Sequence, residues 1–273
     1  MSHSWNTTTL DSEADVFNEL TKLKGKRWLC RGQSKRYGAG GLVPSIDREK
    51  LKNLSRLEKL KLERQSIDIF RSTARFFADP GEQGALADDI IALMVLRHYG
   101  VPTRLLDWSL SPYVAAYFAA EDAAEDHDTE NGEIWTFDKP RYERIGGKQW
   151  KKWPETTIDG SGDGQKFKAE LTAFTVEEPP DWFICTFYPT GFPRQKAQDS
   201  VPTMTARFGR DHAEAIETLF DGEKSRYHLY VVQGKLKWSL LKMLRENHGI
   251  WRGSLFPDTA GAAETAHTVF PVR

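Results

Sequence analysis

The feature that most constrains the fold is one stretch, Leu96 to Ala120, which reads L-R-H-Y-G-V-P-T-R-L-L-D-W-S-L-S-P-Y-V-A-A-Y-F-A-A. Apolar residues recur at three- and four-residue steps before His98, which predicts an amphipathic helix, and Gly100 supplies a left-handed exit from it. Pro102 cannot continue a helix, so the chain should become extended after it. This stretch therefore predicts a helix, a sharp turn and the start of a strand.

The extended run that follows, Thr103 to Trp108, places two charged residues, Arg104 and Asp107, among apolar neighbours. Charges in such a run are tolerated only where they are paired or used for binding. One interpretation is a structural ion pair between the two that pins a strand to a helix. The other is a binding site, because enzymes often place substrate-contacting groups where a strand ends and a helix begins. The sequence alone leaves both open.

A second helix is predicted directly after this run. Ser111 followed by Pro112 is the typical pattern of an N-cap with proline at the first helical position. Val114, Ala115, Phe118 and Ala119 then give the helix an apolar face with small residues, which allows a close approach to whatever it packs against. The acidic segment that begins at Glu121 is predicted to be a solvated helix end and turn.

Composition excludes several broad classes of protein. Charged residues make up 28% of the chain and nearly balance, with a formal net charge of -1, so the chain lacks the basic field of a generic nucleic-acid binder. The two cysteines, Cys30 and Cys185, form neither a disulfide framework nor a metal-ligand spacing, which favours a reducing compartment. No apolar run reaches membrane-spanning length and the first residues lack a signal-peptide pattern, so we expect a cytoplasmic protein with no membrane contact.

The remaining sequence predicts alternating helices and strands in one domain over residues 1–273. Helices are expected over Ser12–Leu23, Leu51–Phe77, His212–Phe220 and Trp238–Asn247, and strands over Trp28–Gln33, Glu133–Phe137, Trp182–Tyr188, Val201–Thr205 and Tyr227–Val232. Gly32, inside a strand pattern, indicates a close approach to the backbone. Residues 139–178 are polar and glycine-rich, which predicts a variable loop excursion that moves or becomes ordered on binding.

Several of these motifs together carry a family resemblance. They are W-L-C-R-G-Q, then the H-Y-G-V-P-T-R-L-L-D-W segment, then P-R-x-x-x-Q, and finally S-L-F-P-D. From about Trp28 to about Asp258 the chain resembles the FRG domain family, named for its Phe-Arg-Gly motif, with Cys30 in place of the aromatic residue. The order of these motifs is similar to that of ADP-ribosyltransferases.

The resemblance implies a fold and a set of site residues. The fold implied is α+β and ADP-ribosyltransferase-like: one domain with a mixed, mostly antiparallel sheet flanked by helices. Arg31 would hold the NAD phosphates and ribose, Ser109 and Ser111 would form the serine-containing second element, and Gln198 would stand at the third. The candidate catalytic residues are Gln198, Asp107 and His98, the candidate cofactor-binding residues are Arg31, Gly32, Tyr99, Arg104, Trp108, Ser109 and Ser111, and no metal site is expected.

The activity implied is NAD-dependent ADP-ribosyl transfer to RNA, DNA or protein, as in a toxin or antiphage effector, and a toxin would have an antitoxin partner. Loss of nicotinamide leaves an oxocarbenium-like ribose, so the site needs a cation for the phosphates, an aromatic surface and a polar group at the ribose. Gln198 carries no charge, which leaves Asp107 or Asp199 to supply a carboxylate.

Two other functional hypotheses compete with this one. The first is a non-catalytic module that grips a phosphate or nucleotide with Arg31 and Arg104. The second is a nuclease-like hydrolase, which would need a metal-ligand cluster, and the histidines show no ligand spacing.

Overall fold

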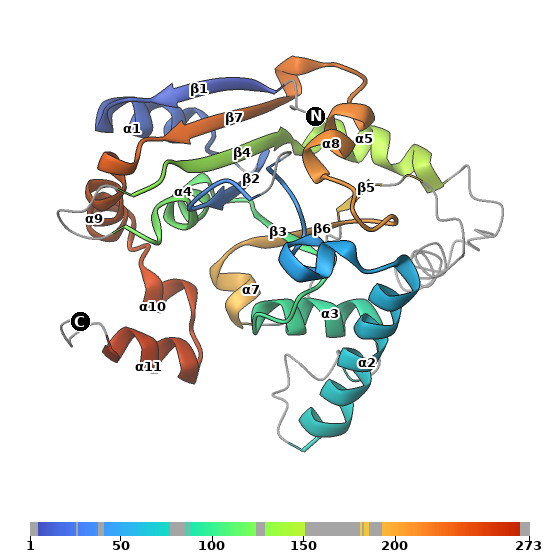
Figure 1. The fold of residues 1–273 in the computed structure, drawn as a ribbon. Helices are drawn as coiled ribbons and strands as arrows, with labels where there is room; N and C mark the ends of the chain where they lie inside the picture. The colour runs from blue at the N-terminus through green and yellow to red at the C-terminus, as the bar shows by residue number, and fades with distance from the viewer. Residues whose placement is uncertain are drawn as a thin grey trace.

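A seven-stranded sheet forms the centre of the molecule (Figure 1). The structure is a computed structural model that describes residues 5–25, 27–37, 41–76, 86, 88–123, 129–150, 181, 183–185 and 193–267. Within them the strand order is β1-β7-β4-β2-β3-β6-β5. The strands are β1 (Asn6–Leu10), β2 (Trp28–Gln33), β3 (Leu106–Ser109), β4 (Gly132–Asp138), β5 (Phe183–Cys185), β6 (Ser200–Thr205) and β7 (Tyr227–Val232). Neighbours pair antiparallel except β1 and β7, which are parallel, so the expectation of a mixed, mostly antiparallel sheet is confirmed.

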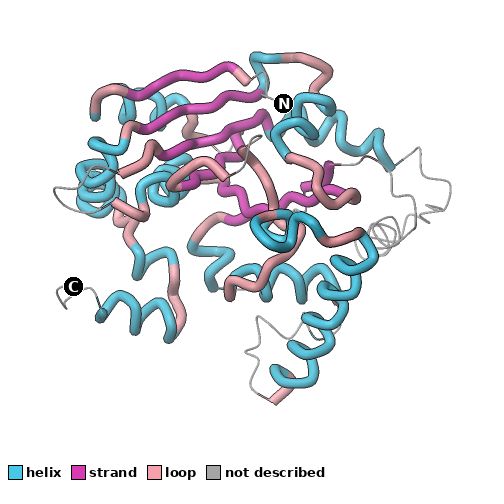
Figure 2. Tube along the Cα trace, in the orientation of Figure 1, coloured by secondary structure: helices cyan, strands magenta, loops and turns pink. Residues whose placement is uncertain are grey.

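Helices cover both faces of this sheet (Figure 2). They are α1 (Glu13–Lys22), α2 (Arg56–Ala74), α3 (Asp89–His98), α4 (Pro112–Ala120), α5 (Lys139–Trp150), α7 (Pro193–Ala197), α8 (His212–Leu219), α9 (Lys237–His248), α10 (Arg252–Leu255) and α11 (Thr259–His267). Among the described helices, none combines the length and the apolar character needed to cross a membrane. The chain is therefore an α+β protein built on a single sheet.

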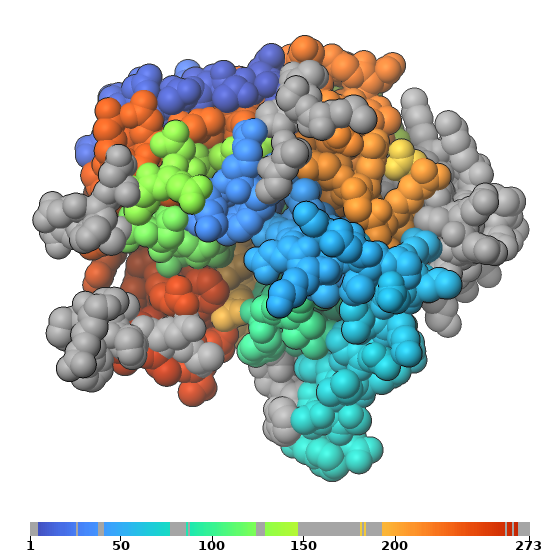
Figure 3. Space-filling view, viewed as in Figure 1, coloured from blue at the N-terminus to red at the C-terminus, as the bar shows by residue number. Residues whose placement is uncertain are grey.

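The core divides into three apolar clusters. One lies between the sheet and α1, α4 and α9, and a second lies on the opposite face under α5 and α8. Strand β2 feeds both, because Leu29 belongs to the second cluster and Cys30 to the first, as the two-residue period of a strand requires. The third cluster joins α2 and α3 to Met204 of β6 and to Leu105, the residue before β3. In the space-filling view α2 forms the lobe at the bottom of the molecule (Figure 3).

Helix α4 lies unusually close to β2, as the glycine in that strand predicted. A Cβ atom added at Gly32 would lie 1.7 Å from the backbone oxygen of Ala115. Ala115 and Ala119 are 1% and 0% exposed, so the small face of α4 is the face against the strand. Only glycine at this position lets the two backbones come so near.

The local signals around α3 and α4 are also confirmed. Gly100 follows α3 with a φ of 82°, and Pro112 is at the start of α4. The Ser111 side chain accepts a hydrogen bond from the backbone N–H of Val114, which satisfies one donor at the start of that helix.

Three expectations about secondary structure were wrong or incomplete. Residues 139–150 form α5 rather than a loop, and the remainder of the predicted excursion, 151–178, lies outside the described residues. Helix α2 begins at Arg56 instead of Leu51, because Ser55 and Glu58 form a capping box that fixes its first turn. Strands and helices that the periodicity did not predict are β1, α7, α10 and α11.

Candidate functional site

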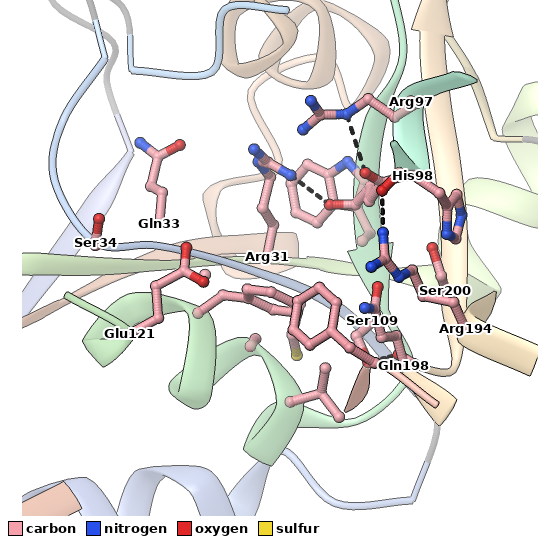
Figure 4. A pocket seen from close by; sticks show the side chains of 18 of the residues that line it. Arg31, Gln33, Ser34, Arg97, His98, Ser109, Glu121, Arg194, Gln198 and Ser200 are labelled. Carbon is pink, nitrogen blue, oxygen red and sulfur yellow. Dashed lines mark hydrogen bonds and ion pairs between the residues drawn. The ribbon is translucent and has the colours of Figure 1, made fainter. Parts of the chain in front are cut away.

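A pocket of about 260 Å³ opens where β2 and β3 separate (Figure 4). The two strands pair at one position, Cys30 opposite Ser109, and then diverge. Beyond that point the Arg31 guanidinium takes over the link between them: its Nη1 donates a hydrogen bond of 2.6 Å to the backbone oxygen of Asp107. The Arg31 side chain therefore lies between the two strands where they diverge.

The pocket wall comes from segments far apart in the sequence. Strands β2 and β3, the end of α3, helix α4 and the chain before β6 each contribute to it. Its charged and aromatic side chains are Arg31, Tyr37, Arg48, Arg97, His98, Asp107, Trp108, Phe118, Glu121, Arg194 and Phe256.

Arg31 lies at the centre of this wall and is 9% exposed. Its Nε atom is buried and has no hydrogen-bond partner among the described residues. Burial first, and then the positive charge of Arg97, lower the pKa of Arg31 to about 9. The guanidinium is still protonated at neutral pH, but its charge is poorly compensated, which favours an anionic ligand.

Arg97 is already paired, since its Nε lies 3.1 Å from Oδ2 of Asp107. Burial would raise the pKa of Asp107, but the charges of Arg97, His98 and Arg31 outweigh it, so the pKa lies below its ordinary value. Asp107 is therefore held in its ionised form. The interpretation in which Asp107 forms an ion pair with Arg104 was therefore wrong.

Arg48 approaches the pocket from the segment before α2. Its guanidinium lies 4.1 Å from the ring centroid of Tyr37, and its Nε donates to the backbone oxygen of Val43. Its buried Nη2 has no partner in the described part of the chain. Burial and then the charge of Arg97 lower the pKa of Arg48.

Arg194, from α7, closes the opposite side. It donates to the backbone oxygen of His98, lies 3.3 Å from Asp258, and stacks 4.5 Å from the ring centroid of Phe256. Its Nε is buried without a partner among the described residues, as is the hydroxyl of Ser200 beside it.

These pairs leave an excess of positive charge. Asp107 pairs with Arg97 and Asp258 with Arg194, whereas Arg31 and Arg48 have no carboxylate within 4 Å among the residues described. Buried donors without partners are rare in folded proteins, and here several gather at one pocket. The arrangement suits a ligand that carries several acceptor oxygens and a negative charge, such as a phosphate ester.

Glu121 supplies a second carboxylate to the pocket. It follows α4, and its side chain points into the pocket (Figure 4). Partial desolvation, the largest cause, raises the pKa of Glu121 to about 7. The negative charge of Asp122 also raises it, and the positive charges of Arg252, Arg31 and Lys237 lower it. The residue is exposed at the rim of the pocket.

Most of the predicted site residues meet at this pocket. Arg31, Gly32, His98, Asp107, Trp108, Ser109 and Gln198 all line it. Gln198 is anchored twice: its Nε2 donates to the backbone oxygen of Leu255, and its own backbone oxygen accepts from Ser109. Burial, as the main cause, lowers the pKa of His98.

Three predicted site residues lie elsewhere. Arg104 is buried outside the pocket, where its Nε and Nη2 donate to the Glu63 carboxylate. Tyr99 is 56% exposed and Ser111 serves as the cap of α4. Arg104, a candidate cofactor-binding residue, therefore does not line the pocket with Arg31 and Asp107.

The aromatic surface also differs from the prediction. Trp108 is 1% exposed, donates from Nε1 to Thr203 and packs edge-on against Phe137, so its ring belongs to the core. Phe118 and Phe256, which were not predicted, line the pocket instead. The motif S-L-F-P-D contains Phe256 and was the signal that could have identified it.

Other pocket residues that were not predicted as site residues include Gln33, Arg48, Arg97, Glu121 and Arg194. The segment that begins at Glu121 was assigned to a solvated helix end. Within the described residues, no group of three or more His, Cys, Asp or Glu side chains could hold a metal ion.

Comparison with known proteins gives one match. Residues 26–128 match the model of the FRG domain family, so this part of the chain is an FRG domain. No curated protein and no solved structure matches the chain. The matched residues include Arg31, Arg97, Asp107 and Glu121, whereas Arg194 lies beyond them.

Proposed function

We propose that this protein, whose residues 26–128 form an FRG domain, binds NAD in the arginine-lined pocket and transfers ADP-ribose to a macromolecular acceptor. The observation that carries the proposal is a pocket that combines unpartnered arginine donors with two carboxylates. The donors suit a pyrophosphate, and the carboxylates suit a reaction in which positive charge develops on a sugar.

The arrangement of the motifs supports this proposal. Arg31 is on β2, Ser109 on β3, and Gln198 lies two residues before the start of β6. These three strands are neighbours in the sheet, although the motifs are separated by many residues in sequence. The order that resembles ADP-ribosyltransferases in sequence therefore corresponds to one continuous surface.

The two carboxylates have environments that drive their pKa values apart. The pKa of Asp107 is lowered and that of Glu121 is raised to about 7. Such a separation is typical of sites that need one permanent negative charge and one group that exchanges a proton. We assign to Asp107 the electrostatic stabilisation of the ribose cation, and to Glu121 the role of general base.

The bond changes balance without a further reactant. The bond between ribose C1′ and the nicotinamide nitrogen breaks, and its electron pair leaves with nicotinamide. A nucleophile on the acceptor bonds to C1′ and loses its proton to the Glu121 carboxylate. In this scheme Arg31 holds the phosphates, and Gln198 contacts the ribose.

The experiment is an incubation of the full chain with NAD labelled in its ADP-ribose part and a cell lysate. We expect release of nicotinamide and entry of label into protein, RNA or DNA. Arg31→Ala should abolish transfer because the phosphates lose their clamp, and Gln198→Ala should lower turnover more than binding. Arg64→Ala removes a surface arginine of α2, 59% exposed, and serves as the control that should stay active.

The competing function is a binding module without catalysis. It is favoured by Gln198, whose amide is engaged by Leu255 and carries no charge. Binding of NAD with neither nicotinamide release nor label transfer to any acceptor would select this alternative. The absence of NAD binding would exclude both uses of NAD.

A further inference from the structure

The pocket has two chemically different ends. Figure 4 shows Arg97, His98 and Arg194 on one side of Arg31, and Gln33, Ser34 and Glu121 on the other. The first side carries donors and positive charge. The second side presents an amide oxygen and a carboxylate, which accept hydrogen bonds.

Gln33 is fixed in the orientation that makes it an acceptor. It is 3% exposed, and its Nε2 donates 2.8 Å hydrogen bonds both to Glu133 and to the backbone oxygen of Gly41. Because both partners can only accept, the amide cannot turn over without losing them. Its oxygen therefore faces the Arg31 side, as Figure 4 shows, and this buried atom has no partner among the described residues.

Glu121 adds to the acceptor character of this end. Its side chain reaches into the pocket from the rim, so a ligand can contact it without opening the core. When ionised, it attracts a donor and repels an anion. Gln33 and Glu121 together thus favour an N–H group and disfavour a carboxylate.

We infer that this end of the pocket binds the nicotinamide carboxamide and excludes the corresponding acid, with Gln33 as the specificity-determining residue. The inference rests on the proposed function, since it takes NAD as the ligand. A carboxamide can donate an N–H to the oxygen of Gln33, whereas a carboxylate has no donor and adds a negative charge beside Glu121.

The size of the pocket selects this half of the ligand. A volume of about 260 Å³ lies below the roughly 300–1,000 Å³ of sites that enclose a whole drug-sized ligand. It can enclose part of a dinucleotide. The half that must be shielded from water is the one that contains the reacting bond, which is the nicotinamide ribose.

The test compares two ligands that differ only in this group: NAD and nicotinic acid adenine dinucleotide. Their dissociation constants are measured by calorimetry with the full chain at pH 8, where Glu121 is largely ionised. We expect NAD to bind at least about tenfold more tightly, the size of one well-placed hydrogen bond together with a removed repulsion.

Variants locate the source of this preference. Gln33→Met keeps the length of the side chain and should reduce the ratio to below about threefold. Glu121→Gln, at the rim and without a volume change, removes the negative charge that repels a carboxylate, so it should improve binding of the acid and lower the ratio. Arg36→Met removes another hydrogen bond to Glu133 without touching the pocket and should keep the wild-type ratio.

Each outcome decides a separate point. Equal binding of the two dinucleotides by the wild-type protein overturns the inference even if transfer of ADP-ribose is observed. An equal loss of preference in Arg36→Met and Gln33→Met overturns the direct role of Gln33. Binding of neither dinucleotide overturns the proposed use of NAD together with the inference.

Discussion

The buried ion pair between Arg104 and Glu63 gives the most quantitative prediction for stability. The two side chains are 5% and 6% exposed, and Arg104 Nε lies 3.0 Å from each carboxylate oxygen of Glu63. The guanidinium also lies 4.2 Å from the ring centroid of Phe208. The pair therefore joins α2 to the chain just before β3 through contacts that water hardly reaches.

Removing one partner should strand the other as a buried charge. We expect Arg104→Ala and Glu63→Ala each to lower the free energy of unfolding by about 3–5 kcal/mol. The double variant Arg104→Met/Glu63→Leu should be more stable than either single variant, because two well-packed apolar side chains leave no charge unpaired.

The assay is urea unfolding followed by tryptophan fluorescence, with the free energy taken from linear extrapolation. Since Arg104 lies outside the pocket, ligand affinity of the folded variants should be unchanged. Losses below about 1 kcal/mol for both single variants, or a double variant that is the least stable of the three, would refute the reasoning.

Three further predictions concern other parts of the molecule. Gly32→Ala should lower the unfolding free energy by about 3 kcal/mol or more, because a Cβ meets the backbone of Ala115 at 1.7 Å; a melting temperature equal to wild type would contradict the packing of β2 on α4. If Glu121 is the general base, NAD consumption should rise from pH 6 to pH 8 as its carboxyl, with a pKa raised to about 7, becomes ionised, and Glu121→Gln should lose this rise; a variant profile that keeps it would exclude Glu121. Burial, and then the charge of Arg31, lower the pKa of His212 to about 3, so its NMR signals should not titrate between pH 5 and 8. Its contribution to stability should fall as the pH drops below the pKa of histidine in the unfolded chain. Titration near pH 6.5 would show that this histidine is exposed.

Local signals in the sequence predicted the elements around the site well. Pro102, Gly100 and Ser111 act on their immediate neighbours, so turns and caps could be read directly, and Gly32 predicted a close backbone contact. The approximate bounds of most strands followed from short apolar runs.

The pairing of charges could not be predicted in the same way. Arg104 and Asp107 are three residues apart, yet each pairs with a residue on a helix, Glu63 on α2 and Arg97 on α3. Which partner a buried charge finds depends on helix packing. Glu121 illustrates the same limit. Its acidic neighbours in sequence predict a solvent-exposed helix end, whereas the separation of β2 and β3 opens a pocket that Glu121 lines.

Strand β1 was missed for a related reason. Its sequence, N-T-T-T-L, lacks an alternating apolar pattern, and it lies at the sheet edge with β7 as its one neighbour in the strand order. Backbone pairing with β7 is what makes it a strand, and such pairing is not visible in its own residues.

The most direct measurement is a crystal structure of the protein with ADP-ribose, the part of NAD that carries both phosphates. The account predicts the pyrophosphate within hydrogen-bond distance of Nε of Arg31 and Nη2 of Arg48, two buried nitrogen atoms that have no hydrogen-bond partner among the described residues. A pyrophosphate bound away from both arginines would contradict the central claim, and so would an empty pocket in crystals grown at saturating ADP-ribose.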